Sequence, residues 1–251
     1  MKYLLENHNY LFNKNDYYLI PDAGNKDGTF IEIAEKSILQ FKLIVKGKQV
    51  HASTPDLGLN AHRVSLELAK KIYDNLHKKF NSKNNLFDPP ESTFEPTMVK
   101  GSSSSPNIIP GLHEVTFDCR VIPDYKLDDV LKEINRVIVK LKEKNKKIIE
   151  NKEFPEIDLE IIDKNDSPRP TNPENKLVME IKKTIKELRK REAVVGGIGG
   201  ITFATFLRAY NYEAVVWSTN DDVAHQPNEY AIIENLINDS KVFATLMLRL
   251  R

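Results

Sequence analysis

The segment NDDVAHQPNEY, residues 220–230, places His225 among three acidic residues, Asp221, Asp222 and Glu229. Histidine nitrogens and carboxylate oxygens are ligands that zinc accepts in catalytic sites. The segment has two interpretations: a metal ligand at the end of a strand, or a polar loop that caps a helix. Asp22, in the turn-like IPDAG, is also a residue type suited to zinc, but about 200 residues separate it from His225, so spacing alone does not link them.

Three further motifs are ambiguous when taken alone. His51 follows a strand-like stretch in GKQVHASTP, where a histidine is more often a surface residue than a catalyst. VVGGIGGIT, residues 194–202, matches neither G-x-G-x-x-G nor the Walker A pattern. It favours a tight turn at a helix N-terminus, where N–H groups can bind an anionic group. GSSSSP, residues 101–106, lacks the glycine that a nucleophile elbow needs.

The elements that must position these residues follow from apolar periodicity. YEAVVWS, residues 212–218, predicts a buried strand directly before the His225 segment. The stretch 231–250 predicts a long amphipathic helix directly after it. Near the start of the chain, residues 17–37 predict two strands joined by a hairpin turn at Asp27 and Gly28.

The middle of the chain has a distinctive order of elements. Strand patterns and helical patterns alternate as β-α-β-β-α-β, at residues 38–47, 60–80, 92–101, 113–122, 126–147 and 156–163. This is the order of a ferredoxin-like sheet. We therefore expect an inserted ferredoxin-like domain over 37–164, within an α/β domain made of 1–36 and 165–251.

The composition excludes several classes of protein. The 251 residues carry 37 Lys and Arg against 36 Asp and Glu, a net charge of +1, so neither nucleic acid nor a membrane surface is an expected partner. No apolar run is long enough for a signal peptide or a membrane span. The single Cys119 cannot form an internal disulfide, which is typical of a cytoplasmic protein.

Three segments carry a resemblance to a known family. GKQVHASTPDLGLNAHR, NIIPGLHEVTFDCRVIPD and VVWSTNDDVAHQPNEY occur in the order of the corresponding motifs of co-catalytic zinc metallopeptidase family 20. That family includes succinyl-diaminopimelate desuccinylase, acetylornithine deacetylase, aminoacylase and carboxypeptidase G. The chain resembles archaeal desuccinylase-like members most closely. The resemblance implies a partial zinc-peptidase-like α/β catalytic domain with an inserted ferredoxin-like lid that also mediates dimerisation.

The resemblance also implies a metal centre. Asp22 would bind one of two metals and His225 the other, with zinc expected and cobalt or manganese as alternatives. Asn228 and Glu229 would then cap the last helix. The reaction would be hydrolysis of an amide bond in an N-acyl amino acid or a small peptide, by desuccinylase, deacylase or dipeptidase chemistry.

The remaining site residues are implied in the same way. His51 would stabilise the oxyanion in the site of the other subunit of a homodimer. Asn107 and Arg120 would hold the carboxylate of a small substrate. The turn formed by Gly199, Gly200 and Thr202 would contribute N–H groups.

The sequence departs from the family pattern in two ways. Ile201 stands where the family often has glycine, and the upstream H-x-D and Glu-Glu segments are absent. We therefore expect an N-terminally truncated form, inactive by itself. Three origins remain open: a split enzyme with a separately encoded N-terminal half, an interrupted gene, or a non-catalytic dimerisation or binding module.

Overall fold

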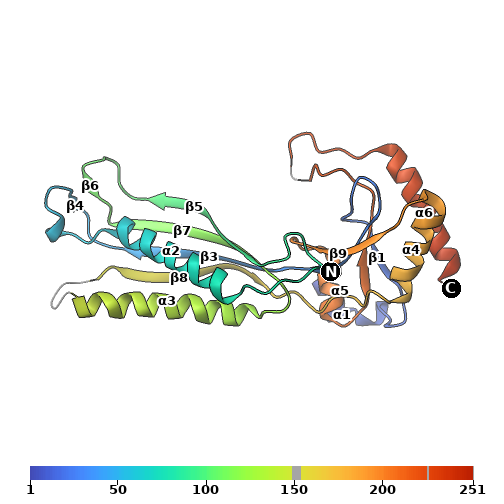
Figure 1. The fold of residues 1–251 in the computed structure, drawn as a ribbon, viewed down its shortest axis with the longest axis horizontal. Coiled ribbons are helices and arrows are strands. Elements are labelled where there is room, and N and C mark those ends of the chain that lie inside the picture. Colours follow the sequence, from blue (N-terminus) through green and yellow to red (C-terminus); the bar gives the residue numbers. More distant parts are fainter. Residues whose placement is uncertain (149–153, 225, 251) are drawn as a thin grey trace. The chain divides into compact units, whose positions relative to one another are not determined.

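The computed structural model describes residues 1–148, 154–224 and 226–250 (Figure 1). It divides the chain into two compact units. The α/β unit comprises Met1–Lys36, Asn85–Pro90 and Ser167–Arg251, and the lid unit comprises Ser37–Asn84 and Glu91–Asp166. This is the α/β fold with an inserted domain that the sequence predicts.

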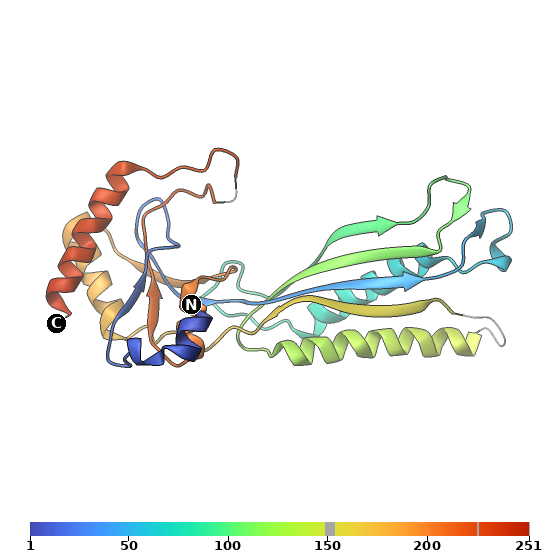
Figure 2. The same cartoon turned by 180° about the vertical axis from the view of Figure 1, so that it is seen from behind.

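The α/β unit is built on a four-stranded sheet with the order β1-β10-β2-β9 (Figure 2). The strands are β1 (Tyr18–Ile20), β2 (Phe30–Glu35), β9 (Val194–Ile198) and β10 (Ala214–Val216). The helices are α1 (Lys2–Asn7), α4 (Lys176–Arg189), α5 (Phe203–Ala209) and α6 (Ile233–Arg249), with a short 3-10 turn at Asn9–Leu11.

Alternation along β10 separates the two faces of this sheet. Val215 packs in a cluster with residues of α4 and α6, whereas Ala214 and Val216 pack with Leu5 of α1 and Leu207 of α5. Successive side chains of a strand point to opposite faces, so a short apolar strand is covered on both. Helices therefore lie on both sides of the sheet, as in other α/β folds.

The hairpin predicted at Asp27 and Gly28 is wrong. The turn exists, with Gly28 at φ +59°, but β1 and β2 do not pair with each other. Instead β10 lies between them, parallel to β1 and antiparallel to β2. A local turn signal cannot reveal a strand that enters from about 200 residues further along the chain.

The lid unit has the ferredoxin-like topology. Its sheet has the order β5-β7-β3-β8 with antiparallel neighbours. The elements are β3 (Ser37–Lys46), α2 (Ala61–Lys79), β5 (Thr93–Gly101), β7 (Leu112–Val121), α3 (Leu127–Ile148) and β8 (Glu156–Asn165). Two short strands, β4 (Val50–His51) and β6 (Ile108–Ile109), pair at one end, near a 3-10 turn at Pro55–Leu57.

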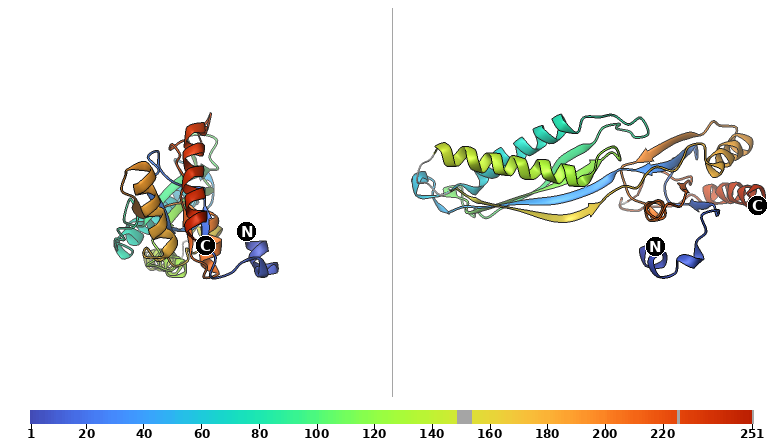
Figure 3. Two further views of the ribbon diagram at one scale, coloured as in Figure 1. Left: turned by 90° about the vertical axis from the view of Figure 1, so that its right-hand side faces the viewer. Right: turned by 90° about the horizontal axis from the view of Figure 1, so that it is seen from below.

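One face of the lid sheet is covered by α2 and α3, which lie side by side (Figure 3). Leu39, Phe41, Leu43 and Val45 alternate along β3 and are fully buried in the core with both helices. Asn60 begins α2 as its N-cap, because its side chain accepts a hydrogen bond from the Arg63 N–H.

Two local features differ from the sequence-based expectations. Residues 85–90, expected within the lid, lie in the α/β unit, where the Leu86 carbonyl accepts a hydrogen bond from the Gly197 N–H. The predicted cap by Asn228 and Glu229 is also wrong, because α6 begins after Ile232 and Asn228 adopts a left-handed conformation at φ +63°. In the part of the chain that the structure describes, no helix combines the length and the apolar character needed to cross a membrane.

Candidate functional site

The carboxyl ends of β1 and β10 meet at one edge of the sheet. Tyr18 pairs with Ala214 and Ile20 with Val216, so the two parallel strands end together. Asp22 follows the first strand, and Asp221 and Asp222 follow the second. Such an edge is where α/β sheets bind ligands. A cavity of about 800 Å³ lies there, and its polar lining is Asp22, Asn25, Lys26, Thr202, Asn220, Asp221 and Asp222.

The glycine-rich turn forms another wall of this Asp22 cavity. β9 ends at Ile198, and α5 begins at Phe203. A Cβ added to Gly199 would have no heavy atom within 4 Å, whereas one added to Gly24 would lie 1.8 Å from the Ser218 carbonyl oxygen. Packing therefore demands a glycine at Gly24 but not at Gly199. Of this turn, Gly200, Ile201 and Thr202 line the cavity, whereas Gly199 does not.

Thr202 holds this turn in place through hydrogen bonds to Glu35. Its N–H and its hydroxyl both donate to Oε1 of Glu35, at 2.7 and 2.5 Å, while its Oγ1 accepts a hydrogen bond from the Ala204 N–H and so caps α5. Both hydrogen-bond donors of Thr202 are thus directed to Glu35. A substrate contact that uses a Thr202 donor would require one of these bonds to break.

Beneath the turn, two buried carboxylates share one guanidinium. Nη1 of Arg208 lies 2.8 Å from Oε1 of Glu32 and 3.8 Å from Oε2 of Glu35, and all three side chains are at most 2% exposed. Burial raises the pKa of Glu32 to about 8, against the opposing effect of Arg208. Burial also raises the pKa of Glu35, although its bonds with Thr202 and the charge of Arg208 oppose the rise.

The cavity is suited to a metal only in part. Asp22, Asp221 and Asp222 place carboxylate groups around it, and carboxylate oxygens bind zinc. Within residues 1–148, 154–224 and 226–250, however, no three His, Cys, Asp or Glu residues form a group that could hold an ion. His225 lies outside the described residues, although Val223 and Ala224, which precede it, line the cavity.

His51 and Asn107 lie together at one end of the lid unit. Nε2 of His51 is 3.3 Å from Nδ2 of Asn107, and the Ala52 N–H donates to the Asn107 carbonyl at 2.8 Å. Nδ1 of His51 is also 2.7 Å from Oγ of Ser53. The pairing of β4 with β6 brings these residues together across more than 50 positions of sequence. Both side chains are exposed, so they can contact a second molecule.

Arg120 lies at the opposite end of β7. It pairs in register with Ile38 and Thr93, about 26 Å along the strand from Leu112 at ~3.3 Å per residue. Its Nε and Nη2 donate to Asp118 at 2.6 and 3.0 Å. Burial alone would raise the pKa of Asp118, but hydrogen bonds from Arg120 and Gln40 lower it. Within one lid unit, Arg120 and Asn107 are too far apart to hold the same small carboxylate.

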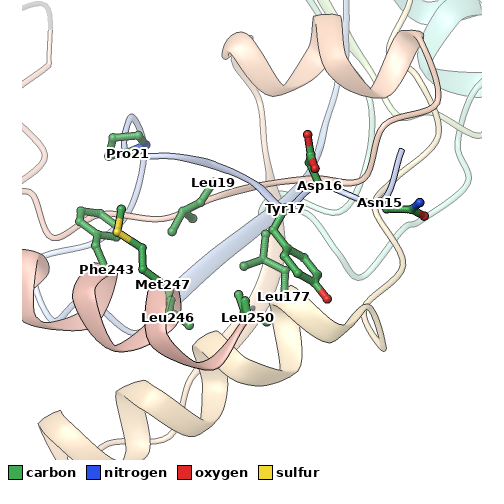
Figure 4. A pocket seen from close by; sticks show the side chains of 10 residues that line it. All are labelled: Asn15, Asp16, Tyr17, Leu19, Pro21, Leu177, Phe243, Leu246, Met247 and Leu250. Carbon is green, nitrogen blue, oxygen red and sulfur yellow. The ribbon is translucent and has the colours of Figure 1, made fainter. Parts of the chain in front are cut away.

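A second cavity in the α/β unit, of about 750 Å³, is apolar (Figure 4). Leu19 from β1 and Leu177 from α4 face side chains of α6, and Tyr17 and Asp16 lie at one side. The α6 residues are Phe243, Leu246, Met247 and Leu250. Asp16 is the single acidic side chain in this lining, so the cavity offers a surface for packing rather than for acid–base chemistry.

Three residues predicted from the sequence, Asp22, Gly200 and Thr202, line one cavity, whereas the predicted Gly199 does not. Glu35 and Arg208 were not predicted, because their positions carry no motif. Asp221 and Asp222 were noted as neighbours of His225 but not as cavity residues. The directly adjacent pair of acids after a predicted strand was the signal that could have identified them.

Comparisons with known proteins agree with this description. A family model described as peptidase dimerisation domain matches residues 33–146. An uncharacterised metallohydrolase from Methanocaldococcus jannaschii is 43% identical over 249 residues, which are 98% of this chain and 60% of that protein. One from Methanococcus maripaludis is 39% identical over 253 residues, which are 98% of this chain and 61% of that protein. The chain thus spans about 60% of the length of these relatives.

Solved structures show the same fold. A tripeptidase from Staphylococcus aureus has a TM-score of 0.74 at 15% identity, and the match covers 94% of this chain and 57% of that one. Human carnosine dipeptidase 1 has a TM-score of 0.69 at 17% identity, and the match covers 100% of this chain and 62% of that one. Residues 33–146 are thus similar to a peptidase dimerisation domain, and the chain as a whole is similar to metallohydrolases.

Proposed function

We propose that this relative of metallohydrolases forms the larger part of a metal-dependent amide hydrolase that acts on N-acyl amino acids or small peptides. The observation that carries the proposal is the Asp22 cavity. Carboxylates from two strand ends and the turn that contains Gly200 line it, in a chain 43% identical to a metallohydrolase.

In this proposal, Asp22 and His225 each bind one metal ion, with zinc preferred over cobalt and manganese. A bound zinc ion would polarise the amide carbonyl and lower the pKa of a water molecule. The residues of this chain would orient the substrate. N–H groups of the Gly199–Gly200 turn would face it from one wall of the cavity, and Glu35 would keep that turn in place through Thr202.

The lid residues would act from two subunits. His51 and Asn107 lie at one end of the lid sheet, and Arg120 lies at the other. A single small substrate can therefore meet all three only if Arg120 comes from one copy and the exposed His51 and Asn107 from another. This is how the proposed homodimer would complete each site. A carboxylate-bearing substrate would then share Arg120 with Asp118, which accepts hydrogen bonds from its Nε and Nη2.

A further polypeptide would be needed for activity. The apolar cavity of Figure 4 adjoins Met247, which is 75% exposed, and α6 also exposes Ile233 and Leu248. Exposed apolar side chains next to an apolar cavity are features that an interface would cover. The relatives have about 40% of their length outside the match. We propose that the corresponding segment covers this surface and supplies the remaining metal ligands and the general base.

The test compares the 251-residue chain with a complemented form. Complementation uses the polypeptide that corresponds to the unmatched part of the M. jannaschii relative. Zinc binding is measured by calorimetry, and hydrolysis is measured with N-succinyl and N-acetyl amino acids and dipeptides. We expect weak zinc binding and no measurable hydrolysis by the chain alone, because residues 1–148, 154–224 and 226–250 contain no group of three ligands and His225 would add only one. The complemented form should bind zinc tightly and hydrolyse one substrate class.

A variant of His225 tests its assignment to the metal site, and a variant of His8 is the control. His225→Ala in the complemented form should abolish hydrolysis and leave the oligomeric state unchanged, whereas His8→Ala, remote from the Asp22 cavity, should change neither. Tight stoichiometric zinc binding by the chain alone would contradict the proposed division of ligands. A complemented form that assembles but hydrolyses none of these substrates would instead favour a non-catalytic binding module.

A further inference from the structure

A third cavity of about 390 Å³ lies in the α/β unit, between the end of α4, the middle of α6 and the loop after Asp22. Its polar lining is Lys26, Asp27, Arg189, Arg191, Asn238 and Lys241. Four cations therefore face one carboxylate, although the whole chain is nearly neutral at +1. This concentration of positive charge is not what composition alone would produce.

Two of the four cations already have an acidic partner. Nη1 of Arg191 lies 2.8 Å from Asp27, and Nη2 of Arg189 pairs with Asp239. Lys241 donates to Oδ1 of Asn238 at 2.9 Å, and this amide carries no charge. Among the residues that the structure describes, neither Lys26 nor Lys241 pairs with a carboxylate. Two lysines that form no ion pair with a described carboxylate thus face one cavity.

Arg189 is held in a fixed position beside them. Its guanidinium lies over the Trp217 ring, 5.2 Å from the centroid, and its side chain is 16% exposed against 55% for Arg191. Gly28 makes room for it, since a Cβ there would lie 2.2 Å from Nη1 of Arg189. A preorganised guanidinium loses little conformational entropy when it binds an oxyanion.

We propose that this cavity binds a doubly charged oxyanion of the phosphate type. The two unpaired lysines match the charge of a phosphate group near neutral pH, which is about −1.5 to −2. Lysine ammonium groups are donors that phosphate recognition uses, and the Arg189 guanidinium, whose Nη2 pairs with Asp239, adds positive charge to the lining. A monocarboxylate would leave one of the two lysine charges uncompensated. The proposal is independent of the hydrolase function. Because Lys26 also lines the Asp22 cavity, a bound anion would change the electrostatic potential there.

Calorimetry on the full 251-residue chain tests this proposal. Inorganic phosphate and glycerol 3-phosphate are titrated near neutral pH at constant chloride, with succinate as the dicarboxylate comparison. We expect one site per chain for at least one phosphate probe, with a dissociation constant of about 1 mM or lower. The probe that binds more tightly indicates whether the ligand of this cavity is free phosphate or a phosphate ester. Lys26→Ala and Lys241→Ala should each weaken binding about tenfold, because each removes one charge-assisted hydrogen bond.

Lys183→Ala is the matched control. Lys183 is exposed on α4, loses the same charge on substitution and does not line the cavity. Circular dichroism and thermal melting verify that the variants fold. If Lys183→Ala weakens phosphate binding equally, binding depends on net charge alone, and this result would overturn the proposal. Equal affinity for succinate, or no binding of either phosphate probe, would overturn it as well.

Discussion

The buried trio of Glu32, Glu35 and Arg208 concentrates charge where water does not reach it. The buried guanidinium of Arg208 carries a positive charge that requires a counter-charge, and two carboxylates are within reach. The hydrogen bonds from Thr202 favour ionised Glu35, because an N–H and a hydroxyl both donate to it. Glu32 is then the carboxyl group that holds a proton near neutral pH.

This arrangement predicts a stability that depends on pH. The pKa of Glu32 rises from an ordinary 4.5 to about 8 in the folded protein, so the folded state binds more protons than the unfolded state between these values. The free energy of unfolding should therefore fall as pH rises through this window, by about 1.4 kcal/mol per pH unit at most for this one group. Urea unfolding at a series of pH values measures it.

Glu32→Gln should remove most of this slope, since the amide does not titrate. Glu234→Gln on the exposed first turn of α6 is the control and should leave the slope unchanged. An unfolding free energy that is flat over this pH range in the unsubstituted chain would show that Glu32 is ionised in the folded state.

At the scale of elements, one aspartate joins α6 to the loop after β10. Asp239 accepts hydrogen bonds from the N–H and the hydroxyl of Thr219, at 2.8 and 2.6 Å, and it also pairs with Arg189. Asp239 is 5% exposed and Thr219 is 8% exposed. The loop that leads to Asp221 and Asp222 is thus fixed to a helix that comes later in the chain.

Asp239→Ala should destabilise the α/β unit by about 3 kcal/mol, because it leaves a mostly buried arginine and a backbone N–H without their partner. Denaturant unfolding followed by Trp217 fluorescence reports on this unit, since Trp217 is the single tryptophan and packs in its core. Asn235→Ala, on the same helix, serves as the control. A loss below about 0.5 kcal/mol would show that the loop holds its position without this aspartate.

A part of the fold could be predicted from the sequence where its determinants are local, and could not where they are distant in the chain. The lid unit was predictable because its strands show period-two alternation, as in Leu39, Phe41, Leu43 and Val45, and each helix carries a clear apolar stripe. The β1-β10-β2 order was not, because a three-residue strand such as Ala214–Val216 has no periodicity that specifies its neighbours. Glu35 and Arg208 escaped prediction for the same reason, since their partners are distant in sequence.

At the scale of the whole molecule, the exposed edges of the lid sheet bear on assembly. The outer strand β8 carries the acidic residues Glu156, Asp158, Glu160 and Asp163, and charges protect an edge from pairing. On the other outer strand, β5, Met98 and Val99 are each 67% exposed. We therefore expect two copies to associate through the β5 edge.

Val99→Asp should disrupt the dimer. Burying an unpaired carboxylate at the new interface costs about 3 kcal/mol or more, which raises the dissociation constant at least about a hundredfold. Analytical ultracentrifugation at micromolar concentration measures the effect. Ile162→Asp introduces the same charge on β8 and should leave the dimer intact. The opposite outcome, with Ile162→Asp disruptive and Val99→Asp silent, would assign the interface to the β8 edge.

The position of β10 between β1 and β2 has a consequence for biosynthesis. A ribosome releases β1 and β2 roughly 10 to 40 seconds before β10, since about 200 residues separate them and translation adds about 5 to 20 residues per second. Before β10 emerges the lid unit can fold, because its last strand, β8, ends at Asn165, while Ile31 and Ile33 still lack the residues of β10 and α6 that pack with them. The nascent chain thus exposes an incomplete sheet of the α/β unit while the lid unit is already folded. Chaperones that bind apolar strands can act at this stage.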